Sequence, residues 1–154
     1  MAEQELTYEF ETEKYTGVYY FINKDVIEGR ELDFMSLIKE RRCNTCMVET
    51  TKKNNKKADS TVQKEIEAIA KCCASKGEFL SPYMPVKESL FRMMLKEANR
   101  PMSLIDLHWE ITEELASPTH PMALSIGHIK RILDRDYYYG FSETTGKKKK
   151  RRKT

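Results

Sequence analysis

Residues 86–141 decide the fold, and their sequence is VKESLFRMMLKEANRPMSLIDLHWEITEELASPTHPMALSIGHIKRILDRDYYYGF. Apolar residues recur in it at helical spacing in three separate segments. This spacing predicts helices over 86–98, over Leu104–Ala116, and from Ser125 to about Asp134. The stretch therefore predicts a compact unit of three short helices.

The breaks between these helices have ordinary causes. Pro101 ends the first helix because proline cannot continue one, and Ser103 can cap the second. After the third helix, the aromatic run Tyr137–Phe141 is typical of a strand, and Ser142–Gly146 is typical of a turn. The order is therefore three helices, a strand, a turn and a basic segment, KKKKRRKT.

This order resembles the winged-helix variant of the helix-turn-helix, on the segments LFRMMLKEANRPMSLIDLHWEIT, ALSIGHIKRILDRD and YYYGFSETTGKKKKRR. The resemblance implies that the third helix enters the major groove of DNA and that the following hairpin forms a wing on the backbone or minor groove. The nucleic-acid-binding candidates are Ser125, His128, Lys130, Arg131, Arg135, Lys147, Lys148, Lys149, Lys150, Arg151 and Arg152.

The pattern of the third helix leads to the same candidates. If its isoleucines and Leu133 face the core, Lys130 and Arg131 face solvent, within two turns of the capping Ser125. Helix N-termini favour phosphate, and arginine can bind guanine edges with two hydrogen bonds. An alternative stays open, in which the winged helix docks a protein and the basic tail is a localisation signal.

Charge is distributed unevenly along the chain, although the net charge is only +3. Residues 1–40 contain four basic and ten acidic residues, a net charge of −6, whereas residues 121–154 contain ten basic and three acidic residues, a net charge of +7. This polarity predicts that the C-terminal end binds a polyanion, in the first place duplex DNA. The acidic N-terminal part is expected to face a protein partner or to stay clear of the DNA.

The N-terminal part is predicted from weaker patterns. Residues 6–23 are rich in Tyr, Phe, Val and Thr, which predicts a β-hairpin with its turn at Lys14–Gly17. Glu31–Arg42 has a helical apolar face, and a longer helix is expected to start at Ser60, which with Gln63 forms a capping-box pattern. We therefore expect an α+β protein with an N-terminal part at 1–80, a winged helix at 85–146 and a basic tail at 147–154.

All four cysteines fall into two pairs. Cys43 and Cys46 form a C-x2-C, and 25 residues separate this pair from Cys72 and Cys73, a separation that resembles that of zinc ribbons. Adjacent residues of a helix diverge by about 100°, so Cys72 and Cys73 can both bind one metal only if the helix is distorted there or if the metal sits between them. Four thiolates would close the coordination sphere, which predicts a structural Zn²⁺ with no catalytic role.

Other interpretations of the cysteines remain open. Cys73 lies on the apolar stripe of its helix and can be a small core residue, and a C-x2-C can also serve redox or iron–sulfur chemistry. Arg41, Arg42 and Lys71 are the cations expected to stabilise thiolates nearby.

The remaining sequence features narrow the class of protein. There is no P-loop, G-x-G-x-x-G, H-E-x-x-H or G-x-S-x-G motif, so an enzyme is not expected. No apolar run approaches the length of a membrane span, and the acidic N-terminus lacks the features of a signal peptide. We expect a soluble intracellular protein of the cytoplasm or nucleoid, or of the nucleus in a eukaryotic host, that regulates transcription or takes part in a related DNA transaction.

Overall fold

The computed structural model describes residues 9–43, 61–115 and 123–145. It has an α+β fold, as the sequence predicts. The elements are β1 (Val18–Ile22), α2 (Lys24–Gly29), α3 (Phe34–Lys39), α5 (Val62–Lys71), the 3₁₀-helix η1 (Cys73–Ser75), α6 (Val86–Lys96), β2 (Met102–Ser103), α7 (Leu104–Trp109), the π-helical turn η2 (Glu110–Leu115), α8 (Ile126–Asp134) and β3 (Phe141–Thr145). Within these residues, no helix has both the length and the apolar character needed to cross a bilayer.

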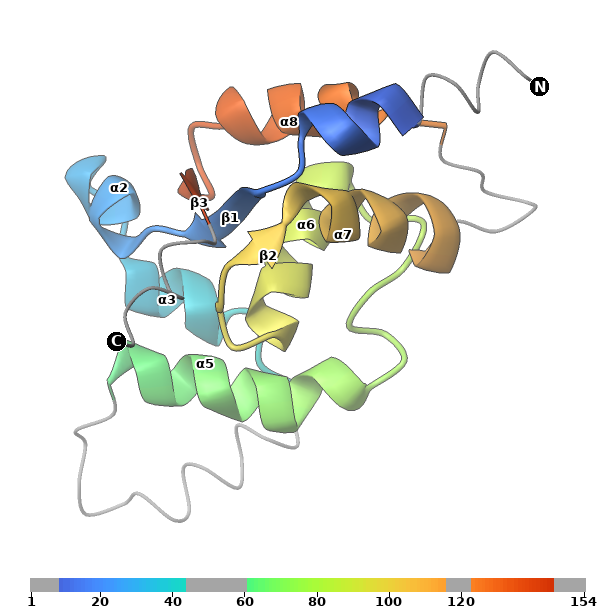
Figure 1. The fold of residues 1–154 in the computed structure, drawn as a ribbon. Coiled ribbons are helices and arrows are strands. Elements are labelled where there is room, and N and C mark those ends of the chain that lie inside the picture. The colour runs from blue at the N-terminus through green and yellow to red at the C-terminus, as the bar shows by residue number, and fades with distance from the viewer. Residues whose placement is uncertain (1–8, 44–60, 116–122, 146–154) are drawn as a thin grey trace, which may run out of the picture.

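The sheet joins the two ends of the chain. Its strand order is β2–β1–β3, and both pairings are antiparallel. Tyr19 of β1 lies opposite Ser103 on one side and opposite Thr144 on the other. A strand from the N-terminal part is therefore the central strand of a sheet whose outer strands flank the C-terminal helices (Figure 1).

The predicted N-terminal β-hairpin is wrong. In the described part of this stretch, residues 9–14 are helical and only 18–22 form a strand. The sequence EFETEK contains good helix formers, and its helix carries Glu11 to the start of α8, where the carboxylate accepts hydrogen bonds from the N–H groups of Ile126 and Gly127 at 3.0 and 3.3 Å. A tertiary contact therefore favours the helix over the strand that the aromatic composition suggests.

The three C-terminal helices lie where the sequence predicts them. The hydroxyl groups of Ser103 and Ser125 accept hydrogen bonds from the N–H groups of Asp106 and His128, each at 3.0 Å, which confirms both predicted N-caps. The second predicted helix changes character midway, since α7 ends at Trp109 and continues as the wider turn η2.

The other helices match the prediction less closely. The helix predicted at Glu31–Arg42 is present as α3, which begins at an Asp33 cap. The N-cap of α5 is Thr61, whose side chain accepts from the N–H of Lys64, and Ser60 lies outside the described residues. Helix α2 was not expected from the sequence.

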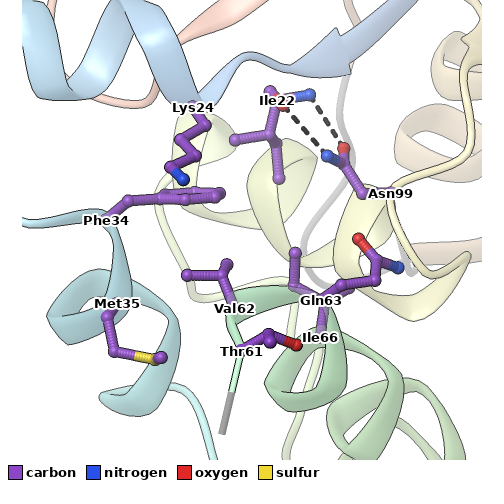
Figure 2. A pocket seen from close by; sticks show the side chains of 9 residues that line it. All are labelled: Ile22, Lys24, Phe34, Met35, Thr61, Val62, Gln63, Ile66 and Asn99. Carbon is purple, nitrogen blue, oxygen red and sulfur yellow. Dashed lines mark hydrogen bonds between the residues drawn. The ribbon is translucent and has the colours of Figure 1, made fainter. Parts of the chain in front are cut away.

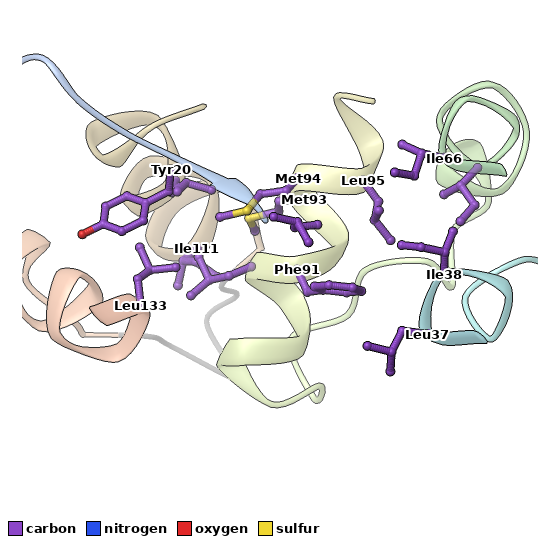
Figure 3. Packing of buried hydrophobic residues seen from close by; sticks show 14 of the residues in the cluster. Tyr20, Leu37, Ile38, Ile66, Phe91, Met93, Met94, Leu95, Ile111 and Leu133 are labelled. Atoms are coloured by element: carbon purple, nitrogen blue, oxygen red, sulfur yellow. The ribbon is translucent and has the colours of Figure 1, made fainter. Parts of the chain in front are cut away.

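One hydrophobic core runs through the molecule, with α6 at its centre. Buried residues of α6 contact two groups of side chains on opposite sides of the helix (Figure 3). Tyr20, Ile111 and Leu133 lie on one side, and Ile38 and Ile66 lie on the other. The predicted N-terminal and C-terminal parts consequently share one core.

The segment after α8 differs from the prediction. The strand covers Phe141–Thr145 and not Tyr137–Phe141. Residues 142–145 of the turn predicted at Ser142–Gly146 belong to that strand, and Gly146 lies outside the described residues. One buried carboxylate oxygen of Asp136 accepts hydrogen bonds from the N–H groups of Tyr138, Tyr139 and Gly140, at 3.1, 2.7 and 3.2 Å. These bonds fold the aromatic run into a loop, and the predicted wing is represented among the described residues by β3 alone.

Replacement of Asp136 tests this loop. We expect Asp136→Ala to lower the free energy of unfolding by about 2–3 kcal/mol, because three N–H groups lose their acceptor. Asp136→Asn keeps one oxygen and should cost clearly less. The measurement is urea unfolding of both variants, and equal losses would show that the hydrogen bonds are not what stabilises the loop.

A partly buried ion-pair network attaches α6 to the end of α3. Glu88 accepts hydrogen bonds from the guanidinium of Arg41 at 2.8 and 3.0 Å, from Arg92 at 2.7 Å and from the hydroxyl of Tyr139 at 2.9 Å. Burial alone would raise the pKa of Glu88, but these donors lower it from the ordinary 4.5 to about 2. The charged form of Glu88 is therefore strongly favoured in the folded protein.

This shift gives Glu88 a defined pH dependence. A folded pKa below the unfolded value contributes stability above about pH 4.5 that is lost as the pH falls towards 2. We expect Glu88→Gln to be less stable than the parent by up to about 3 kcal/mol at neutral pH, with the difference shrinking over that window. Urea unfolding at several pH values measures the difference, with the exposed Glu113→Gln as control; a constant difference down to pH 2 would contradict the prediction.

Candidate metal centre and α8 surface

Cys72 and Cys73 lie at a break between two kinds of helix. Helix α5 ends at Lys71, Cys72 is its C-cap with φ −114° and ψ −63°, and η1 begins at Cys73. The adjacent cysteines are thus not on one regular helix. A distorted helix is one of the two arrangements that the sequence allows if both sulfurs are to reach one metal ion.

Cys43 completes a cluster of three sulfur atoms. Its Sγ lies 3.7 Å from that of Cys72, its N–H donates to the Sγ of Cys73 at 3.0 Å, and all three sulfurs lie within 4.8 Å of one another. A disulfide needs a separation of about 2.05 Å, whereas two thiolates about 2.3 Å from one tetrahedral ion lie about 3.8 Å apart. The three cysteines therefore lie close enough to hold a metal ion.

The two arginines before Cys43 hold its backbone in place. Arg41 pairs with Glu88 of α6, and Arg42 forms a buried ion pair with Glu65 of α5. Both arginines are thus paired with carboxylates, and these pairs position the backbone that leads into Cys43. Lys71, the third expected cation, is exposed, and no contact with the cysteines is found for it among the described residues.

Lys76 is the cation that the structure places beside the sulfurs. Its Nζ lies 3.6 Å from the Sγ of Cys43 and 3.8 Å from that of Cys72. The charges of these two cysteines raise the pKa of Lys76 above its ordinary value. Lys76 follows Cys72 by four residues and has an extended backbone at the end of η1, so the nearness of the two residues in the sequence was the available signal.

The fourth predicted ligand, Cys46, lies outside the described residues, so the four-cysteine site is represented by three of its members. Sulfur donors suit a soft or borderline metal ion such as Zn²⁺. A hydrogen bond from backbone N–H to a ligand sulfur, as at Cys43, is the kind of outer contact that orients metal ligands.

The predicted nucleic-acid residues of α8 fall into two groups. His128, Arg131 and Arg135 are exposed and follow one another at spacings of three and four residues, so they share one face of the helix and its C-cap. We call this face the α8 stripe. Ser125 is occupied as the N-cap, and Lys147, Lys148, Lys149, Lys150, Arg151 and Arg152 lie outside the described residues.

Lys130 points to the other side, towards the sheet. Its ammonium donates to Asp134 at 2.8 Å, to Glu143 at 3.1 Å and to the hydroxyl of Tyr20 at 3.1 Å. Burial would lower the pKa of Lys130, but these acceptors raise it. Lys130 is therefore positively charged, and the carboxylates of Asp134 and Glu143 balance its charge. Its contacts join α8 to β1 and β3.

A hollow of about 580 Å³ lies between the end of β1, α3 and the start of α5 (Figure 2). The side chain of Asn99 pairs with both backbone groups of Ile22 at its edge, at 2.8 and 2.9 Å. Lys24 is the one ionisable residue of the lining among the described residues. This lining contains no pair of acid and base groups.

Comparison of the chain with models of known protein families, with characterised proteins and with solved structures finds no match. The interpretation of the metal centre and of the α8 stripe therefore depends on their own geometry.

Removal of one sulfur tests the metal centre. We expect purified protein to contain bound metal and Cys73→Ser to lose it, with a fall in melting temperature of about 10 °C, because a ligand at about 1,000 times its Kd contributes about 4 kcal/mol. Ser75→Ala is the matched control, since it changes the same turn and leaves every sulfur. Metal content near zero in the parent, with a melting temperature insensitive to chelator, would rule out the centre.

Proposed function

We propose that the protein binds duplex DNA through the α8 stripe and is stabilised by a structural zinc ion. The observation that carries the proposal is the exposure of Arg131 and Arg135 on one face, neither of which forms an ion pair with the described residues. Guanidinium groups held by a rigid helix suit both guanine edges and phosphates. The predicted role in transcription or a related transaction follows from such binding.

The arrangement of the C-terminal elements supports this proposal. Helix α6, strand β2, helices α7 and α8 and strand β3 follow one another as in the resemblance to winged helices. His108 of α7 contacts the carbonyl of Leu124 through Nε2 at 2.7 Å, just before α8. β1 is the central strand of the sheet. In this proposal, α8 is the helix that enters the major groove of DNA.

The geometry changes the expected role of Lys130. Because its ammonium is already bound by two carboxylates, we assign it to the attachment of α8 to the sheet and not to DNA contact. Arg131, Arg135 and His128 remain as groove or phosphate contacts, and the basic residues 147–152 add phosphate contacts that are independent of sequence.

Zinc is the metal we assign to the cysteine cluster. The sulfur separation of 3.7 Å suits a tetrahedral thiolate site, and Cys46 would supply the fourth sulfur. The ion would join the segment after α3 to the end of α5, and with four thiolates it would take part in no reaction. Elemental analysis of purified protein identifies the metal.

One observation favours the adaptor function as a second candidate. The carboxylate of Glu11 occupies the first N–H groups of α8, where a phosphate would otherwise bind. An acidic group there disfavours DNA near the start of the helix. If the stripe binds a protein, the basic tail serves localisation.

Duplex binding across a salt series separates the two functions. We expect Arg131→Ala with Arg135→Ala to weaken DNA binding at least tenfold and to reduce the slope of log K against log salt by about 2, for two lost phosphate contacts. Lys39→Ala with Lys64→Ala removes the same charge from exposed positions on α3 and α5 and is the control. An unchanged slope in the arginine variant, or no duplex binding by the parent, would overturn the DNA function in favour of the adaptor.

A further inference from the structure

A second hollow, of about 310 Å³, opens beside the edge strand β2. Its apolar lining includes Tyr19 of β1, Met102 of β2 and Trp109 of α7. Trp109 is the only tryptophan of the chain, and 49% of its surface is exposed. We call this site the Trp109 hollow; it presents a large aromatic ring that the described residues leave half uncovered.

Carboxylates surround the Trp109 hollow. Its lining includes Glu97, Asp106 and Glu110, with Arg100 as its one basic residue. Glu97 pairs with Arg100 only at 3.8 Å, and Glu110 pairs with Lys96 at 4.0 Å. Asp106 is exposed and forms no ion pair within the described part of the chain. The hollow is therefore acidic and its charges are poorly compensated.

We propose that the Trp109 hollow is the docking site of the chain's own basic segment, residues 147–153. That segment, KKKKRRK, carries seven positive charges and no negative one. Lysine and arginine side chains bind favourably over the face of tryptophan and pair with carboxylates. The hollow offers both kinds of partner within one site.

The register of the sheet places the segment within reach. Tyr19, which lines the hollow, lies between Ser103 and Thr144, and adjacent strands are about 4.8 Å apart, so Thr144 and Ser103 are separated by about 10 Å. Side chains directly opposite one another share a face of the sheet, so Thr144 belongs to the face that Tyr19 presents to the hollow. The seven residues after Gly146 can extend more than 20 Å.

Charge also directs the segment away from the other candidate surface. The α8 stripe has the same sign as the segment and repels it, whereas the acidic hollow attracts it. The proposal does not depend on DNA binding. If DNA does bind the segment, the nucleic acid competes with the hollow for the same charges.

Trp109 itself reports the docking, because its fluorescence can be excited selectively in the full-length protein. We expect collisional quenching of Trp109 by acrylamide to rise about twofold when Lys147–Lys153 are replaced by glutamine. The parent should reach the same value near 1 M salt, where the Debye length is about 3 Å. Asp106→Asn with Glu110→Gln should reproduce the tail variant at low salt.

A charge-matched variant controls this experiment. Glu113 and Glu114 are exposed in η2 and do not line the hollow, so Glu113→Gln with Glu114→Gln should leave the quenching unchanged. Equal quenching in the parent and the tail variant would overturn the proposal. Shielding that depends on protein concentration would also overturn it, because the segment would then come from a second copy. Thermal melts confirm that each variant is folded.

Discussion

Pairing of β1 on both of its edges is the constraint on which the rest of the structure depends. β2 and β3 do not pair with each other, so the N-terminal strand alone joins the edge next to α7 to the edge that follows α8. A side chain of β1 also joins the strand to α8, because Tyr20 is buried and its hydroxyl donates to Asp134 at 2.6 Å. At the last residue of the strand, the side chain of Asn99 accepts a hydrogen bond from the N–H of Ile22 and donates one to its carbonyl oxygen. The helices of the C-terminal part thus depend on residues more than 75 positions away.

The cysteine cluster depends on a second set of distant contacts. Arg41 and Arg42 are buried and neutralised by Glu88 and Glu65, from two different helices. Removal of one partner from such a pair leaves a buried charge, which is costly, so the pairs favour a single path for the chain leading into Cys43. The contacts of the protein chain thus bring the three cysteines close enough to hold a metal ion. A preorganised site loses less conformational entropy on binding, which strengthens the affinity for a metal ion.

The sequence predicted the features whose causes are local. Ser103 and Ser125 cap their own helices, and the apolar stripes of α6 and α8 are visible within one segment. Two missed features have distant causes: the helix at 9–14 depends on the contact of Glu11 with α8, and β1 lies between strands that follow it by about 80 and 120 residues.

The loop at Asp136 was missed for a different reason, since three hydrogen bonds to one carboxylate overrode the strand preference of the tyrosines. At the candidate metal centre, the spacing in the sequence pointed to the cysteines, but only the break at the end of α5 brings Cys72 and Cys73 to the same side.

One side of α8 is bound to the sheet, and the opposite side is exposed to solvent. Lys130 and Asp134 neutralise each other and bind the sheet, while Arg131 and Arg135, one residue further on in each case, face solvent. A helix attached only by apolar contacts could shift along its axis, whereas the hydrogen bonds of Lys130 to Tyr20 and Glu143 define its register on β1 and β3. Any ligand of the α8 stripe therefore meets arginines on a backbone that is already fixed. Since rigid placement reduces the entropy lost on binding, the half-exposed ion pairs of Lys130 with Asp134 and Glu143 would strengthen the binding of any ligand to the stripe.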